Sequence, residues 1–303
     1  SSSLANIADL GSELYLAKFS REQESEADIL GVRYMQQAGY SSLGMTRLLE
    51  QLIRERAFQS KLLGQEVAGP DFFSTHPGTP DRVKNARAVA GDKEGALLRD
   101  RYLTEISGLL FGDDPSQGLI RGQRFVHPDL GFEFTVPPNF RIVNATNAVF
   151  ARHYGVGLIS FDIAPRDQSH PDPLVHLTQI WAPNLLLQNL ERIDVNGQPG
   201  ATGVASVSGR IDDYRGRLDV RFVVVQFPGN RLMRFIFMTP VSKTALLRKH
   251  FERVTFSLKP VTQKDAAQVR PYEIRTVQAG SKDTATSLAE NMTLPENKLE
   301  TFR

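Results

Sequence analysis

The segment VRFVVVQFPGNRLMRFIF, residues 220–237, decides the fold of the larger part of this 303-residue chain. Apolar side chains recur at every second position on both sides of residues 228–230, a Pro-Gly-Asn tripeptide typical of a tight turn. Alternation with a period of two places one set of side chains on one face of a strand. The segment therefore predicts a β-hairpin, with the arginines outward and three aromatic side chains inward: Phe222, Phe235 and Phe237.

The same period of two recurs earlier in the chain, around residues 132–136 and 159–163. Residues 173–190 and 243–251 have helical patterns instead. Strands that are interrupted by a few helices are typical of an α+β fold. We therefore predict an α+β domain over residues 121–258, built on an antiparallel sheet.

The part before this domain, residues 1–111, has the helical period of three and four. A first helix is expected from Ser12 to about Gln37, and Gly39 follows it because glycine readily adopts the left-handed conformation of a helix end. A second helix is expected after Ser41 or Ser42, with its inner face formed by Met45, Leu48, Leu49, Leu52 and Ile53. Pro80 suits the first turn of a third helix, and residues 96–110 predict a fourth.

Two further segments complete the predicted multidomain chain. Residues 112–120 are rich in turn-forming residues and predict a linker. Residues 259–303 predict a second linker followed by a short tail, with one strand in 272–277 and one helix in 284–290.

Composition excludes several classes of function. The chain has 36 basic and 34 acidic residues, and no cysteine. The absence of thiols excludes disulfide scaffolds, cysteine nucleophiles and thiolate zinc sites. The near balance of charge argues against a polyanionic partner, and no recognised nucleic-acid motif is present. No apolar run approaches the length of a membrane span.

The sharpest chemical signal is the segment SREQESEAD, residues 20–28, followed by Gly31. Glu24 and Asp28 are four residues apart, so they share one face of a helix. Two carboxylates in that arrangement repel each other unless a cation lies near them. The alternative without a functional role is a solvent-exposed helix face with surface ion pairs.

A second signal lies about fifty residues further along, in the segment STHPGTPDRV, residues 74–83. It places His76 on a turn that the prolines make rigid, just ahead of the helix that begins with Pro80. His76 taken alone is more typical of an ordinary turn than of a metal ligand.

Together the two segments resemble the zinc metallopeptidase family of the CAAX prenyl proteases and HtpX, especially its soluble periplasmic branch. The resemblance covers about the first 105 residues. It implies that Glu24 is the third zinc ligand and that Asp28 orients a ligating histidine. It implies that His76 lies at the mouth of the site, and that Arg82 anchors the site or stabilises developing charge. The implied activity is zinc-dependent cleavage of polypeptides, such as envelope proteins, in the bacterial periplasm or cell envelope.

The sequence departs from this family in one respect. It has no H-E-x-x-H, because no two of its six histidines are four residues apart: His76, His127, His153, His170, His176 and His250. In the family that motif precedes the glutamate helix, so we expect it upstream of Ser1. We therefore expect this chain by itself to be inactive, as the C-terminal portion of a Zn²⁺ peptidase. A degenerate relative, acting as a non-catalytic adaptor or binding module in the envelope, is the alternative.

Three other regions have weaker signals. His170 and His176 bracket residues 171–173, Pro-Asp-Pro, where a metal pair is conceivable but an ordinary loop is favoured. The segments from residue 125 to 140 resemble an extension found in some proteobacterial members of the same peptidase family, and the expected strand order is similar to that of a PsbP-like α/β sandwich. Residues 277–289 are similar to the start of a LysM module, which implies peptidoglycan as a further partner.

Overall fold

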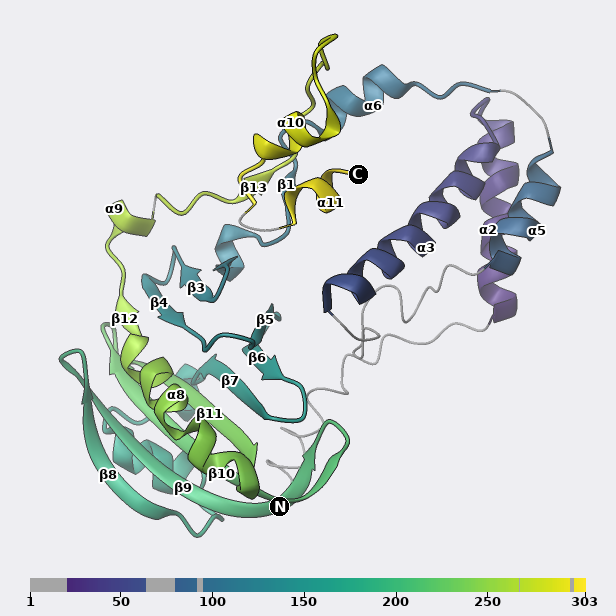
Figure 1. Ribbon diagram of the computed structural model, residues 1–303. Coiled ribbons are helices and arrows are strands. Elements are labelled where there is room, and N and C mark those ends of the chain that lie inside the picture. The colour runs from purple at the N-terminus through teal and green to yellow at the C-terminus, as the bar shows by residue number, and fades with distance from the viewer. Residues whose placement is uncertain (1–20, 64–79, 92–94, 267, 295–296) are drawn as a thin grey trace. The chain divides into compact units, whose positions relative to one another are not determined.

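A computed structural model (Figure 1) describes the following residues: 21–63, 80–91, 95–266, 268–294 and 297–303. The chain divides into two compact units, Gly108–Ile274 and Ser2–Ser107 with Arg275–Arg303. The first is called the α+β unit here. Among the helices of the described residues, none has the length and apolar character needed to cross a bilayer.

The described residues before Ser107 form four helices, which are called the helical part: α2 (Arg21–Gln37), α3 (Leu43–Leu63), α5 (Pro80–Ala90) and α6 (Arg99–Ile106). The predicted ends agree well with these bounds. Gly39 has a left-handed φ of 77° after α2, and Pro80 is the first residue of α5. The predicted residues 12–20 of the first helix lie outside the described residues.

A small apolar core holds the helical part together. Val32, Leu49, Ala86 and Ala90 are buried in it. The two alanines let α5 approach α2 and α3 closely, because they place no bulk between the helices. The prediction that Leu48 lies on the inner face of α3 is wrong: its side chain is 54% exposed, and the neighbouring Leu49 is buried instead.

The fourth predicted helix is shorter than residues 96–110. Ala96 forms a β-bridge with Tyr40, and its backbone N–H and C=O are bound to Gly39 and Ser41. Those groups are therefore unavailable to a helix, and α6 begins only at Arg99.

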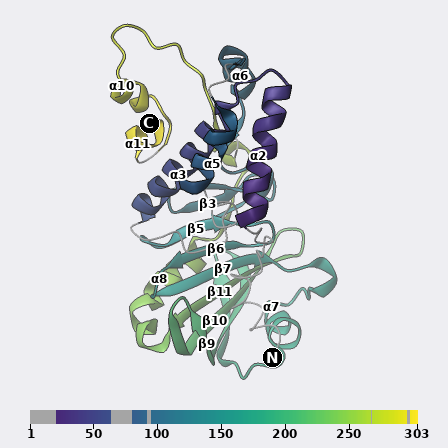
Figure 2. The same cartoon turned by 90° about the vertical axis from the view of Figure 1, so that its right-hand side faces the viewer.

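The α+β unit contains a seven-stranded sheet in the order β5-β6-β7-β11-β10-β9-β8, with every neighbouring pair antiparallel. Figure 2 shows β5, β6, β7, β11, β10 and β9 one below the other. The bounds are β5 (Arg141–Asn144), β6 (Val149–His153), β7 (Gly157–Ile163), β8 (Gln188–Val195), β9 (Gln198–Ile211), β10 (Tyr214–Phe227) and β11 (Arg231–Pro240). The predicted hairpin is β10–β11, and its turn places Gly229 and Asn230 at positive φ. The predicted antiparallel sheet is therefore confirmed.

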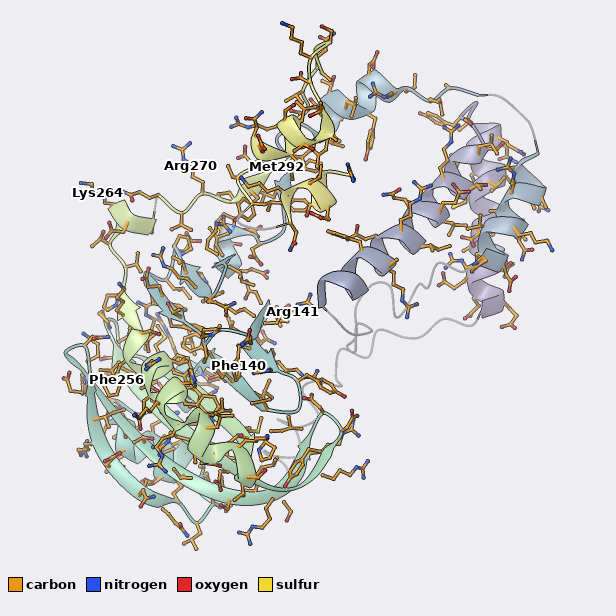
Figure 3. The ribbon with its side chains drawn as sticks, in the orientation of Figure 1. Phe140, Arg141, Phe256, Lys264, Arg270 and Met292 are labelled. Carbon is orange, nitrogen blue, oxygen red and sulfur yellow. The ribbon has the colours of Figure 1, made fainter. Side chains whose placement is uncertain are left out.

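One face of this sheet packs against α8 (Thr244–Ser257) and a second antiparallel sheet in the order β12-β4-β3-β2. The strands of that second sheet are β2 (Leu119–Arg121), β3 (Arg124–His127), β4 (Phe132–Thr135) and β12 (Lys259–Pro260). Phenylalanine rings fill the space between them: Phe235 lies 5.2 Å from Phe134 and 4.8 Å from Phe161, measured between ring centroids. On α8, Phe251 is buried in this core, whereas Phe256 is 50% exposed (Figure 3).

The opposite face of the seven-stranded sheet is covered by residues 173–181, which are called the cover segment here. It consists of a short α7 (Pro173–Val175) and a π-helix, η3 (His176–Trp181). The prediction of one helix over 173–190 is therefore wrong. Ala182 has φ −126° and ψ 45°, and the following Pro183 disfavours a helical conformation at the residue before it.

This second covered face also corrects the prediction for Phe222. Phe222 lies opposite Ile236, while Phe235 lies opposite the adjacent Val223. Because neighbouring positions point to opposite faces of a strand, Phe222 faces the cover segment and not the phenylalanine core. It is buried all the same, because both faces of the sheet are covered.

Short elements complete the chain. β1 (Leu110–Phe111) pairs with β13 (Tyr272–Glu273), which is shorter than the strand predicted over 272–277. In the predicted tail, Thr284 and Ser287 form a capping box for α10 (Ala285–Glu290). The LysM-like tail stays a prediction. The remaining elements are η1 (Pro115–Gln117), η2 (Arg166–Gln168), η4 (Val241–Lys243), α9 (Gln263–Ala266) and α11 (Lys298–Phe302).

The substitution Phe235→Ala tests the phenylalanine core. Phe235 is fully buried, so its removal leaves a cavity and should lower the free energy of unfolding by about 3–5 kcal/mol. Urea denaturation followed by the fluorescence of Trp181 measures the change. Leu186→Ala is the control, because that side chain is 85% exposed and its loss should cost at most about 0.5 kcal/mol. Equal losses in the two variants would contradict the assigned core.

Candidate functional site

The candidate site lies on one face of α2, where Glu24 and Asp28 follow each other by one helical turn. Both residues are buried, with exposed fractions of 8% and 4%. They are called the carboxylate pair here. Glu22 and Glu26 of the same helix are exposed. Burial therefore separates the carboxylate pair from the ordinary surface charges of α2.

Arg82, in the first turn of α5, binds both members of the carboxylate pair. Its Nε and Nη2 donate to the two carboxylate oxygens of Asp28 at 2.7 and 2.8 Å. Its Nη1 lies 2.9 Å from Oε2 of Glu24. The hydrogen bonds to Asp28, together with the charges of both carboxylates, raise the pKa of Arg82 above its ordinary value although burial opposes the shift. One guanidinium thus compensates two buried negative charges.

The surrounding helices fix where this guanidinium lies. The far end of α5 is tied to α2 and to the residue just before α3, because Gln36 Nε2 and Ser42 Oγ both donate to the carbonyl oxygen of Ala90, at 3.2 and 3.1 Å. The same end carries the buried Ala86 and Ala90. Pro80 starts the helix with a φ that suits its first turn. Arg82 is therefore held by the packing of α5 and not by its own flexible side chain alone.

Of the four predicted site residues, Glu24, Asp28 and Arg82 come together in this cluster. His76 lies outside the described residues. The family pattern pointed to Arg82, but the bidentate pairing with Asp28 was not foreseen, because the two residues are 54 positions apart.

The described residues do not by themselves fit a zinc site. No group of three or more His, Asp or Glu side chains among them is placed to hold a metal ion. A structural or catalytic zinc ion needs at least three protein ligands, and this cluster supplies Glu24 as one candidate. Among the described residues, His170 and His176 likewise belong to no such group. The expected loop ends at α7, and His176 is the first residue of the π-helix η3.

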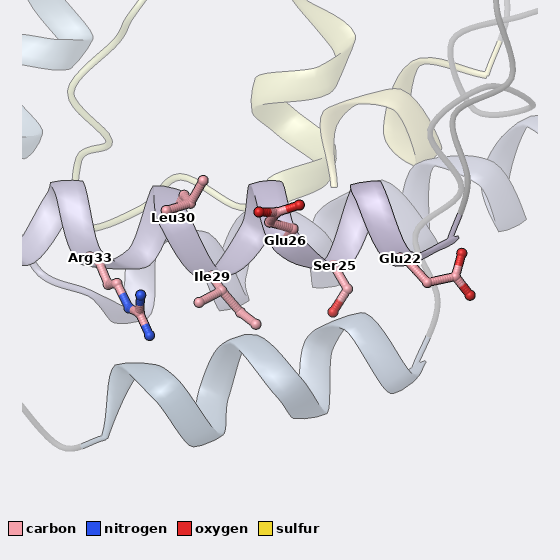
Figure 4. Close-up of a pocket in the computed structure, with 6 residues that line it drawn as sticks. All are labelled: Glu22, Ser25, Glu26, Ile29, Leu30 and Arg33. Atoms are coloured by element: carbon pink, nitrogen blue, oxygen red, sulfur yellow. The ribbon is translucent and has the colours of Figure 1, made fainter.

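A hollow of about 490 Å³ lies along another face of α2 (Figure 4), lined by Glu22, Ser25, Glu26, Ile29, Leu30 and Arg33. These residues follow one another at spacings of one, three and four, so they share a face of the helix that was not among the predicted sites. A second hollow, of about 720 Å³, lies in the α+β unit between residues 128–131 and 261–271. Neither hollow contains a member of the carboxylate pair.

The substitution Arg82→Ala tests the role of the guanidinium. It removes the cation that binds both buried carboxylates, so the opening free energy of α2 should fall by about 3–5 kcal/mol. Native-state hydrogen exchange of the α2 and α5 amides measures it. Arg87→Ala, an exposed residue of the same helix, is the matched control with at most about 0.5 kcal/mol expected. Equal protection in both variants would show that the cluster contributes no stability.

A comparison with protein families matches residues 3–90 to the model of Peptidase family M48. The matched residues include Glu24, Asp28 and Arg82. No curated protein matches the chain.

Several solved structures resemble parts of the chain at low identity. One, from Bacteroides thetaiotaomicron, has a TM-score of 0.36 and 13% identity, and the match covers 48% of this chain and 50% of that one. The cyanobacterial PsbP of Synechocystis sp. PCC 6803 has a TM-score of 0.34 and 18% identity, over 50% and 98%. LpqN of Mycobacterium tuberculosis, described as involved in cell envelope biogenesis, has a TM-score of 0.34 and 10% identity, over 54% and 96%. These likenesses carry no functional argument; a PsbP-like domain and the periplasmic branch of the peptidases stay predictions.

Proposed function

We propose that the helical part supplies the acidic portion of a zinc-dependent endopeptidase site. The observation that carries the proposal is the buried carboxylate pair held by Arg82, together with the match of residues 3–90 to the M48 family. A carboxylate that is to serve as a ligand must be held in one orientation. The cluster meets that requirement for Glu24, because Arg82 and the packing around it restrict the side chain.

Each residue has a defined part in this proposal. Glu24 is the candidate ligand of Zn²⁺. Asp28 positions Arg82 through the bidentate pair, and it is the candidate acceptor for the N–H of a ligating histidine. Arg82 positions both carboxylates, and His76 is proposed at the mouth of the site. The histidine ligands and the general base of an H-E-x-x-H motif are not in this sequence.

We also propose the setting in which this function operates. The substrate is a polypeptide of the bacterial periplasm or cell envelope, and the tail is a candidate contact for peptidoglycan. These proposals rest on the resemblance to the periplasmic branch of the family and to a LysM module. Retention on purified peptidoglycan would separate the proposed role of the tail from that of the helical part.

Zinc content and Glu24→Gln test the proposed site. We expect this chain alone to bind zinc only weakly, with a dissociation constant above about 1 µM, and to cleave no casein. The reason is that one carboxylate provides too few ligands. We expect the complete reading frame that contains this chain to encode an H-E-x-x-H helix upstream of Ser1. The protein that it encodes should hold one zinc ion per molecule. In that protein Glu24→Gln should lose zinc, and Asp28→Asn should weaken zinc binding by about 10–100-fold.

Glu26→Gln is the matched control, since Glu26 lies two positions from Glu24 on the same helix and is exposed. It should keep the zinc content and the activity of the unsubstituted protein. A reading frame without H-E-x-x-H, or full zinc content in Glu24→Gln, would contradict the proposal. Either result would favour a non-catalytic binding module.

A further inference from the structure

His176 lies in the α+β unit, in the cover segment, and takes no part in the proposed peptidase site. Its exposed fraction is 0%. Neither Nδ1 nor Nε2 has a hydrogen-bond partner among the described residues. An imidazolium in such a place would have two buried N–H donors without acceptors, which is costly. The buried ring is therefore compatible with the neutral state only.

The charged groups that face His176 do not stabilise a positive charge on its ring. Arg234 on β11 and Asp162 on β7 already form a bidentate ion pair, with N–O distances of 2.7 and 2.6 Å. His170, just before the cover segment, is a further group of positive sign when protonated. The carboxylate of Asp172, which caps α7, is bound by Arg192 of β8 at 3.0 and 2.7 Å. Both nearby carboxylates are thus already paired with an arginine, so the positive charge of a protonated His176 would have no carboxylate to balance it.

His176 is also coupled to the contacts that hold the cover segment on the sheet. Its ring centroid lies 6.3 Å from that of Trp181. Trp181 packs edge-on against Phe222 of β10 at 5.2 Å, and the guanidinium of Arg234 lies 4.8 Å from its ring centroid. Residues His176–Trp181 form a π-helix, a rare conformation that is frequent at functional sites.

We propose that His176 is an acid-operated latch, whose protonation releases the cover segment from the sheet and exposes the apolar face around Phe222. The release is local, because the phenylalanine core lies on the other face of the sheet and contains no residue of the cover segment. Opening one short segment costs less free energy than unfolding the domain.

The direction of the effect follows from linkage. Burial in the first place, and then the charge of Arg234, lower the pKa of His176 from 6.5 to about 4. A histidine with a lowered pKa in the closed state stabilises that state above pH 6.5, and the stabilisation is lost as the pH falls from 6.5 towards 4. Between pH 7 and pH 5 the equilibrium constant for opening should rise about twentyfold.

Trp181 reports the opening directly, because it is the only tryptophan of the chain. Its emission should shift to the red between pH 6.5 and 4, reversibly, while far-UV circular dichroism stays nearly constant. The variant His176→Leu should keep its emission constant over this range. His250→Gln, on α8, is the control and should behave as the unsubstituted chain. Constant emission of the unsubstituted chain, or the same shift in His176→Leu, would overturn the proposal.

A second measurement decides the matter if His176→Leu does not fold. NMR titration of the imidazole resonances in the unsubstituted chain gives the pKa of His176 itself. A midpoint well below 6.5 that coincides with the shift of Trp181 emission supports the latch. A midpoint at or above 6.5 overturns it, because a proton would then favour the closed state or leave it unchanged.

Discussion

The helical part depends on one guanidinium that two carboxylates share. Glu24 and Asp28 are one helical turn apart and buried, an arrangement that is unfavourable for two negative charges unless a cation compensates them. Arg82 brings that cation from another helix and binds both carboxylates. The same contacts thus fix both the position of α5 against α2 and the orientation of the carboxylate pair. Removal of one partner from such a buried group is costly, whereas exposed ion pairs of the same residue types contribute little.

Local sequence signals predicted much of this part of the chain. Gly39 and Pro80 gave a helix end and a helix start within a residue or two of those observed. The spacing of Glu24 and Asp28 predicted a shared face. The identity of their cation came only from a family pattern, because an ion pair across 54 positions depends on how α5 packs. Composition could not distinguish Arg82 from the arginines nearer in sequence.

In the α+β unit, periodicity predicted the strands and the β10–β11 hairpin but not the second covered face. Residues 222–225, Phe-Val-Val-Val, form a continuous apolar run, which is typical of a strand buried on both sides. Reading the region as simple alternation placed Phe222 on the wrong face. The cover segment lies on the face that contains Phe222. Its helical turns end before Pro183, so the predicted helix over 173–190 was too long. Both errors concern one layer of the fold, and that layer holds the buried His176.

A double-mutant cycle between Arg82 and Asp28 tests the central claim most directly. The variants Arg82→Met, Asp28→Asn and their combination would be compared by native-state hydrogen exchange of the α2 amides. A buried, bidentate, charge-assisted contact predicts a coupling free energy of about 1.5–3 kcal/mol. Effects that add within about 0.5 kcal/mol would contradict the account, because the two side chains would then be energetically independent.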